Sequence, residues 1–144
     1  MAFKFRLEAS LKLAQQKMDR ALGVLSQEMR TLLEIQKERD RETEVLERAL
    51  QGQAEDAMQN PRNLNGWKLH IVAQKEKIRL INERIRFQES VVEECRESLR
   101  ECRILVEKFK RLKEKKWKEF LADEQRKEQA QLDEIGQRVG RESP

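Results

Sequence analysis

The sequence contains no tyrosine, and aromatic residues make up only 5% of its 144 residues. Proline and glycine are also scarce, at two and five residues. This composition gives too little bulky apolar volume for a layered globular core, and few residues that break helices. No apolar run is long enough for a signal peptide or a membrane span. We therefore expect a soluble intracellular protein that would reach a membrane only through a protein partner.

Residues typical of catalytic and metal sites are also scarce. There is one histidine, His70, and neither a G-x-x-x-x-G-K phosphate loop nor a G-x-G-x-x-G motif. The two cysteines lack metal-ligand spacing, and the serines lack credible histidine and aspartate partners. We expect no enzyme, no cofactor and no metal, with His70 at the surface or at the edge of a helix contact.

Cys95 and Cys102 are seven residues apart. On one helix they would lie about 10.5 Å apart along the axis, too far for a disulfide. We interpret them as small buried apolar residues in a reducing compartment. The alternative is an intermolecular disulfide in a parallel dimer.

The strongest pattern is an apolar stripe between residues 71 and 120. Steps of three and four residues meet eleven apolar side chains in fifteen positions. The positions are Ile71, Gln74, Ile78, Ile81, Ile85, Gln88, Val92, Cys95, Leu99, Cys102, Val106, Phe109, Lys113, Lys116 and Phe120. A mean spacing of 3.5 residues is typical of a helix in a coiled coil, which needs a partner helix to bury its stripe.

A second stripe in the N-terminal half supplies that partner. Ten of its thirteen positions are apolar. The thirteen positions are Leu7, Leu11, Ala14, Met18, Ala21, Leu25, Glu28, Leu32, Ile35, Arg39, Glu42, Leu46 and Ala49. Turn residues then gather between Gly52 and Gly66, including Asn60-Pro61. Asn60 is a candidate N-cap with Pro61 at the first helical position, and Asn63 or Asn65 is a later candidate.

These features predict an all-α fold, an antiparallel two-helix coiled-coil hairpin in which the second helix overhangs the first. The predicted boundaries are helix one at about 4–58, a turn at about 59–66 and helix two at about 67–136. The hairpin would form a single domain over 1–140, and 137–144 would be a frayed tail. The overhang of roughly 15 residues would begin near Trp117.

The overhang is strongly charged, although the net charge of the chain is only +4. Between residues 108 and 118, seven basic residues accompany one acid. Acids dominate between residues 119 and 134. This pattern fits either a solvated helix face or a binding surface. Basic runs beside heptads also occur in DNA-binding basic zippers, but there the basic run precedes the zipper, and here the following acids would repel phosphates.

Both termini resemble the FliJ family of the bacterial flagellar protein export apparatus. The opening MAFKFRLEASLKLAQQKMDRA is similar to that family's aromatic-basic start followed by leucine-rich heptads. The close DEQRKEQAQLDEIGQRV is similar to its C-terminal motif. The matching positions are Gln125, Arg126, Glu128, Gln129, Leu132, Asp133, Glu134, Ile135, Gly136, Gln137 and Arg138.

The resemblance implies a coiled coil similar to the central stalk of rotary ATP synthases. Such a protein inserts into a FliI-like hexameric export ATPase and contacts a FlhA-like membrane export gate and export chaperones. It implies a cytoplasmic protein, monomeric when free, that associates peripherally with the inner membrane through the export apparatus and serves flagellum biogenesis and motility. No nucleic acid partner is implied.

The resemblance also places the contact surfaces. The ATPase-ring contact would comprise Lys108, Lys110, Arg111, Lys113, Lys115, Lys116, Trp117, Lys118, Phe120, Gln125, Arg126 and Gln129, with Phe3, Phe5 and Leu7 alongside. The export-gate contact would comprise Trp67, His70, Ile71, Gln74 and Ile78, of which we expect Trp67 and Ile71 to be exposed together. Two alternatives remain: a stalk protein of a virulence type III secretion system, and a generic coiled-coil scaffold.

Overall fold

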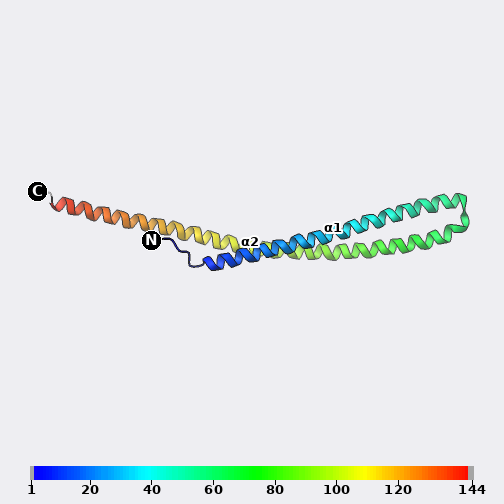
Figure 1. Cartoon of the computed structure of the whole chain (residues 1–144), viewed down its shortest axis with the longest axis horizontal. Coiled ribbons are helices and arrows are strands. Elements are labelled where there is room, and N and C mark those ends of the chain that lie inside the picture. Colours follow the sequence, from blue (N-terminus) through cyan, green and yellow to red (C-terminus); the bar gives the residue numbers. More distant parts are fainter. Residues whose placement is uncertain (1, 143–144) are drawn as a thin grey trace. The chain divides into compact units, whose positions relative to one another are not determined.

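The computed structural model describes residues 2–142 and consists of two long helices joined by a short turn (Figure 1). Helix α1 spans Glu8–Gln59, a 3-10 turn spans Pro61–Asn63, and helix α2 spans Leu64–Glu142. The prediction of an all-α helical hairpin is confirmed. Over the described residues, neither helix carries an apolar stretch that could cross a membrane. The chain divides into two compact units: unit 2 is Arg20–Leu99, and unit 1 is Met1–Asp19 with Arg100–Pro144.

Every buried side chain of the described residues belongs to one of the two predicted stripes. The buried apolar residues are Leu11, Ala14, Leu25, Ile35, Ala49, Ile71, Ile81, Ile85, Val92, Leu99 and Val106. In unit 2, for example, Ile35 packs with Ile81 and Ile85, and Leu32 covers them. Cys95 and Cys102 are free thiols, each half-buried. The 3.5-residue spacing therefore identifies the contact face of both helices.

Two buried glutamines of unit 2 interrupt the apolar contact in the same way. The Nε2 of Gln88 donates to the backbone oxygen of Glu28 at 2.9 Å and to its Oε2 at 2.5 Å. The Nε2 of Gln74 donates to the backbone oxygen of Glu42 at 2.9 Å and to its Oε2 at 2.6 Å. We call these pairs the two glutamine–glutamate layers. Each glutamine thus satisfies its buried donor by bonding across to the facing helix.

The spacing of the layers fixes the register of the hairpin. The two glutamates are 14 residues apart, as are the two glutamines, and the Ile35–Ile81 contact lies midway in both helices. A slip of seven residues would place a glutamine or glutamate opposite an isoleucine. Each polar group buried without a partner costs about 1–3 kcal/mol. Only the observed register satisfies both layers and keeps isoleucine against isoleucine.

The second layer extends into an ion pair. The Nζ of Lys77 lies 2.9 Å from Oε1 of Glu42. The hydrogen bond from Gln74, and after it the one from Lys77, lowers the pKa of the Glu42 carboxyl. A lowered pKa in the folded chain means that this carboxylate stabilises the fold above its unfolded pKa and ceases to do so as the pH falls.

The turn differs in detail from the prediction. Asn60 precedes Pro61 at the start of the 3-10 turn, but its side chain makes no capping hydrogen bond. Instead its backbone nitrogen donates to the oxygen of Asp56 at 2.7 Å, and the nitrogen of Asn63 donates to the oxygen of Asn60 at 3.1 Å. These backbone bonds, together with side-chain hydrogen bonds from Asn63 and Trp67 to Asp56, close the turn. Helix α2 begins at Leu64 and not near residue 67.

Helix α1 begins at Glu8, four residues later than predicted. The residues before it alternate with a period of two: Phe3, Phe5 and Leu7 are half-buried, while Lys4 and Arg6 are exposed. This alternation suits an extended segment over residues 2–5, which a turn at Arg6 and Leu7 joins to the helix.

In unit 1, the first residues of α1 pack on α2. Leu11 and Ala14 meet Val106, with Phe5 and Phe109 around them. An ion pair of 2.8 Å joins the carboxylate of Glu8 to Lys113. The helical contact thus extends to the first turn of α1, beside Lys113.

The predicted frayed tail at 137–144 is wrong over most of its length. Helix α2 continues to Glu142 through Gly136 and Gly140, and residues 143–144 lie outside the described range. Each glycine weakens a helix by about 1 kcal/mol but does not end it. The neighbouring Arg138 pairs with Glu134 one turn away at 3.3 Å, which supports the helix. From Gln125 to Arg141 every side chain is exposed.

The glutamine–glutamate layers yield the first prediction. Gln88→Ala should lower the free energy of unfolding by about 1–3 kcal/mol, because Glu28 loses its hydrogen bonds in a half-buried site. Gln74→Ala should act similarly at the other layer. The double change Glu28→Leu with Gln88→Leu should be at least as stable as the wild type, since apolar pairs often replace buried polar ones without loss. Urea denaturation measures all three, and a double variant less stable than Gln88→Ala would contradict this account.

Candidate protein-interaction surfaces

The basic residues between 108 and 118 form an exposed band on α2, which we call the basic band. Its members are Lys108, Lys110, Arg111, Lys113, Lys115, Lys116 and Lys118. All are exposed except Lys113, which is half-buried. The band lies in unit 1, where α2 reaches the end of its contact with α1. This is the segment that the sequence marks as a candidate binding surface.

Only part of the band is neutralised within the chain. Lys113 pairs with Glu8 at 2.8 Å, Lys116 with Glu119 at 3.4 Å and Lys118 with Glu114 at 3.4 Å. Among the described residues, no ion pair engages the other four members, Lys108, Lys110, Arg111 and Lys115. The band therefore presents four uncompensated cations on about two turns of helix.

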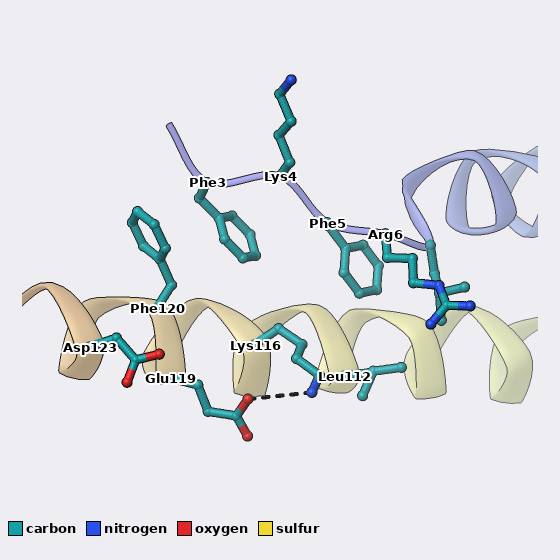
Figure 2. A pocket seen from close by; sticks show the side chains of 10 residues that line it. Phe3, Lys4, Phe5, Arg6, Leu112, Lys116, Glu119, Phe120 and Asp123 are labelled. Atoms are coloured by element: carbon teal, nitrogen blue, oxygen red, sulfur yellow. Dashed lines mark hydrogen bonds and ion pairs between the residues drawn. The ribbon is translucent and has the colours of Figure 1, made fainter. Parts of the chain in front are cut away.

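An aromatic cluster lies beside the basic band. The ring centroid of Phe3 is 5.2 Å from that of Trp117 and 5.5 Å from that of Phe120. The rings of Trp117 and Phe120 stack on α2 with centroids 5.7 Å apart. Figure 2 shows Phe3 extending from the N-terminal segment toward α2 and Phe120 extending from α2 toward that segment. A groove of about 430 Å³ runs between the two segments and is lined by both phenylalanines and by Leu112 and Lys116.

The C-terminal motif lies further along α2, on its exposed continuation. Gln125, Arg126 and Gln129 are all exposed. Arg126 pairs with Asp123, and the Nε2 of Gln129 donates to Oδ1 of Asp133 at 3.1 Å. These contacts run along one helix, so they hold the side chains in place without covering them. The ring-contact residues named from the sequence thus all lie in unit 1 and remain accessible, apart from the half-buried Lys113 and Phe120.

The residues predicted for the gate contact are mostly covered by the contact between the two helices. Ile71 and Gln74 are buried at 6% and 7% exposure, and Trp67 and Ile78 are half-buried. Of the five residues named, only His70 is exposed. Trp67 and Ile71 are therefore no exposed pair. Ile71, Gln74 and Ile78 belong to the stripe that forms the contact between the helices. Side chains buried in that contact are not available to bind a partner protein.

Trp67 instead holds the turn of unit 2 together. Its Nε1 donates to Oδ2 of Asp56 at 2.6 Å, and the edge of the same ring faces His70 at a centroid distance of 6.2 Å. The indole also lies on Gly52 of α1, where an added Cβ would approach the ring to 2.5 Å. A glycine is therefore required at position 52 for the tryptophan to pack.

The accessible apolar residues near the turn lie off the stripe. Leu69 is 74% exposed and Val72 is 66% exposed, on the outer face of the first turns of α2. The sequence signal for them is their position between the stripe residues, since large apolar side chains outside a coiled-coil contact have no partner in a two-helix fold. Over the described residues, no group of histidine, cysteine and acidic side chains could hold a metal ion.

Replacing Gly52 tests the role of Trp67. Gly52→Ala should destabilise the hairpin by about 1–3 kcal/mol, because the added methyl group forces the indole out of place. Gly23→Ala is the matched control, since nothing lies within 4 Å of its added Cβ. That control should instead gain up to about 1 kcal/mol of helix stability. Urea denaturation followed by far-UV circular dichroism measures both changes, and equal stabilisation by the two would contradict the packing described.

This chain is similar in sequence and in fold to known proteins. A search of curated proteins found no match. One similar solved structure is that of a protein described as a YscO homologue, CT670, from Chlamydia trachomatis, with 22% identity and a TM-score of 0.66. That match covers 97% of this chain and 96% of the other, and it shows a shared fold. The family model described as "Flagellar FliJ protein" matches residues 3–143. With that match over nearly its whole length, this chain belongs to the FliJ family.

Proposed function

We propose that this protein is a non-enzymatic component of the bacterial flagellar protein export apparatus. In this proposal it acts as a stalk that promotes the export ATPase ring and links it to the membrane export gate and to substrate chaperones. It would then be cytoplasmic and associated with the inner membrane through the apparatus. Family membership supports the setting, and the surfaces described above support the division of roles.

The observation that carries the proposal is the basic band beside Trp117 and Phe120. Lys108, Lys110, Arg111 and Lys115 are exposed cations without an ion pair in the described structure. Charged contacts act over about 8–10 Å at physiological salt and tolerate changes of orientation. A ring of several subunits around one helix needs contacts of that kind, because no two subunits can meet the same face in the same way.

The aromatic cluster adds the apolar surface that an interface core requires and that charged side chains do not provide. Trp117 is 42% exposed and lies one turn from the half-buried Phe120. A partly exposed aromatic pair with cations around it has the composition of an interface core with a polar rim. The acidic and amide residues that follow on α2, including Gln125 and Gln129, would extend the same surface.

A contact with the export gate requires different residues from those named by the sequence. On the first turns of α2, Leu69 and Val72 are large exposed apolar side chains one turn apart, and His70 is also exposed. We assign the gate contact to this outer face of α2. Ile71 and Gln74 act on it indirectly, by holding α2 against α1.

The shared fold with a YscO homologue supports one alternative, a stalk protein of a virulence type III secretion system. Both functions use the same surfaces, so gene neighbours and the identity of the ATPase captured by the protein distinguish them.

Charge reversal tests the ring contact. Changing Lys108, Lys110, Arg111 and Lys115 together to glutamate should abolish stimulation of the export ATPase, since each reversal replaces attraction by repulsion. These four are chosen because reversing them breaks no ion pair within the described chain. Stimulation by the wild type should also fall as salt rises from about 50 to 300 mM.

The matched control reverses four exposed cations elsewhere, Arg20, Arg30, Lys37 and Arg86. It has the same net charge as the test variant and should stimulate normally, with helicity by circular dichroism retained in both. Equal loss in the two variants would mean that net charge matters and the position of the band does not.

Truncation of the outer face tests the gate contact. Leu69→Ala with Val72→Ala should weaken binding to the gate protein by roughly tenfold or more, because both side chains are available for burial in an interface. The control pair, Leu22→Ala with Val24→Ala, removes similarly exposed apolar residues from α1. Isothermal titration calorimetry measures both. Unchanged affinity of the first pair, with normal helicity, would place the gate contact elsewhere.

A further inference from the structure

The extended N-terminal segment of unit 1 covers part of the surface proposed to bind the ATPase. Phe3 and Phe5 are half-buried on the side facing α2, and Lys4 is exposed. Figure 2 shows the two phenylalanine rings directed toward α2 and the Lys4 side chain directed away from it. The segment therefore lies on α2 with its phenylalanine side chains facing the helix.

The two phenylalanines have different surroundings. Phe5 packs against the buried cluster of Leu11, Ala14 and Val106, so it belongs to the core of unit 1. Phe3 makes its ring contacts with Trp117 and Phe120, at 5.2 and 5.5 Å between centroids. Phe5 thus anchors the segment, whereas Phe3 lies over the aromatic pair that the ring contact would use.

Phe3 is held by few interactions. A backbone hydrogen bond of 3.1 Å from Glu8 to the oxygen of Phe5 secures the segment at its anchor. In the described part of the chain, residues 2–4 have no backbone hydrogen bond and belong to no helix. An aromatic pair contributes a factor of about two to ten to an equilibrium constant. Two such pairs keep Phe3 mostly in place while leaving it able to detach.

We propose that Phe3 is a reversible cover that shields Trp117 and Phe120 in the free protein and is displaced when the export ATPase binds. This inference rests on the proposed function. A partner that needs the uncovered state binds with an apparent affinity reduced by the fraction of molecules that are uncovered. The cover would therefore weaken binding in the free protein, and it would shield an exposed aromatic surface from unspecific association.

Removing the ring of Phe3 tests the cover. Phe3→Ala should strengthen binding to the purified export ATPase by roughly four- to hundredfold, the product of the two factors, because both aromatic pairs are lost from the free state only. In a Trp67→Phe background, Trp117 is the one tryptophan, and its quenching by acrylamide should rise in Phe3→Ala. Deletion of residues 2–4 should have the same two effects. Lys4→Ala, whose side chain points away from α2, is the matched control and should have neither.

The direction in which Phe3→Ala changes the affinity for the ATPase decides whether Phe3 is a cover. If Phe3→Ala binds more weakly than wild type, Phe3 is part of the binding surface and the cover is wrong. Unchanged binding, or unchanged quenching of Trp117, overturns it as well. If neither wild type nor Phe3→Ala binds the ATPase, the proposed function fails and an inhibitory cover fails with it. In that case the quenching result still reports separately whether Phe3 lies on Trp117.

Discussion

The alignment of two apolar stripes in one register is the constraint on which the rest of the structure depends. Apolar burial holds α1 and α2 together, but isoleucine and leucine accept several registers almost equally well. The two glutamine–glutamate layers accept only one register, because a slip leaves the buried amide donors of Gln74 and Gln88 without acceptors. The chain thus gives up some apolar contact at two positions and gains a single alignment.

That alignment decides which surfaces remain for partners. Because α1 begins at Glu8, paired with Lys113, the helical contact on α2 ends where the basic band is densest. The band, the aromatic cluster and the C-terminal motif then follow on a helix that α1 no longer covers. A different register would bury or expose other residues of α2. The position of the proposed ring contact is therefore a consequence of hydrogen bonds made in unit 2.

Much of the fold could be predicted from the sequence, because burial in a two-helix contact leaves a strong period of 3.5 residues. The same period explains why the expected exposure of Ile71 was wrong: Ile71 and Gln74 belong to the 3.5-residue stripe and are therefore buried. Leu69 and Val72 lie outside the period and carry no motif. The non-helical residues 2–7 were missed because Leu7 continues the helical spacing, whereas the alternation of Phe3 and Phe5 is only a few residues long. The helix beyond Gly136 was missed because a glycine weakens a helix without ending it.

Hydrogen exchange of the chain with and without the purified export ATPase tests the central claim most directly. The backbone of α2 between about 108 and 129 is solvent-facing along most of its surface and should exchange faster than the buried contact of unit 2. Binding through the basic band predicts new protection confined to this segment. Protection limited to unit 2, or none with the complex demonstrably formed, would contradict the account.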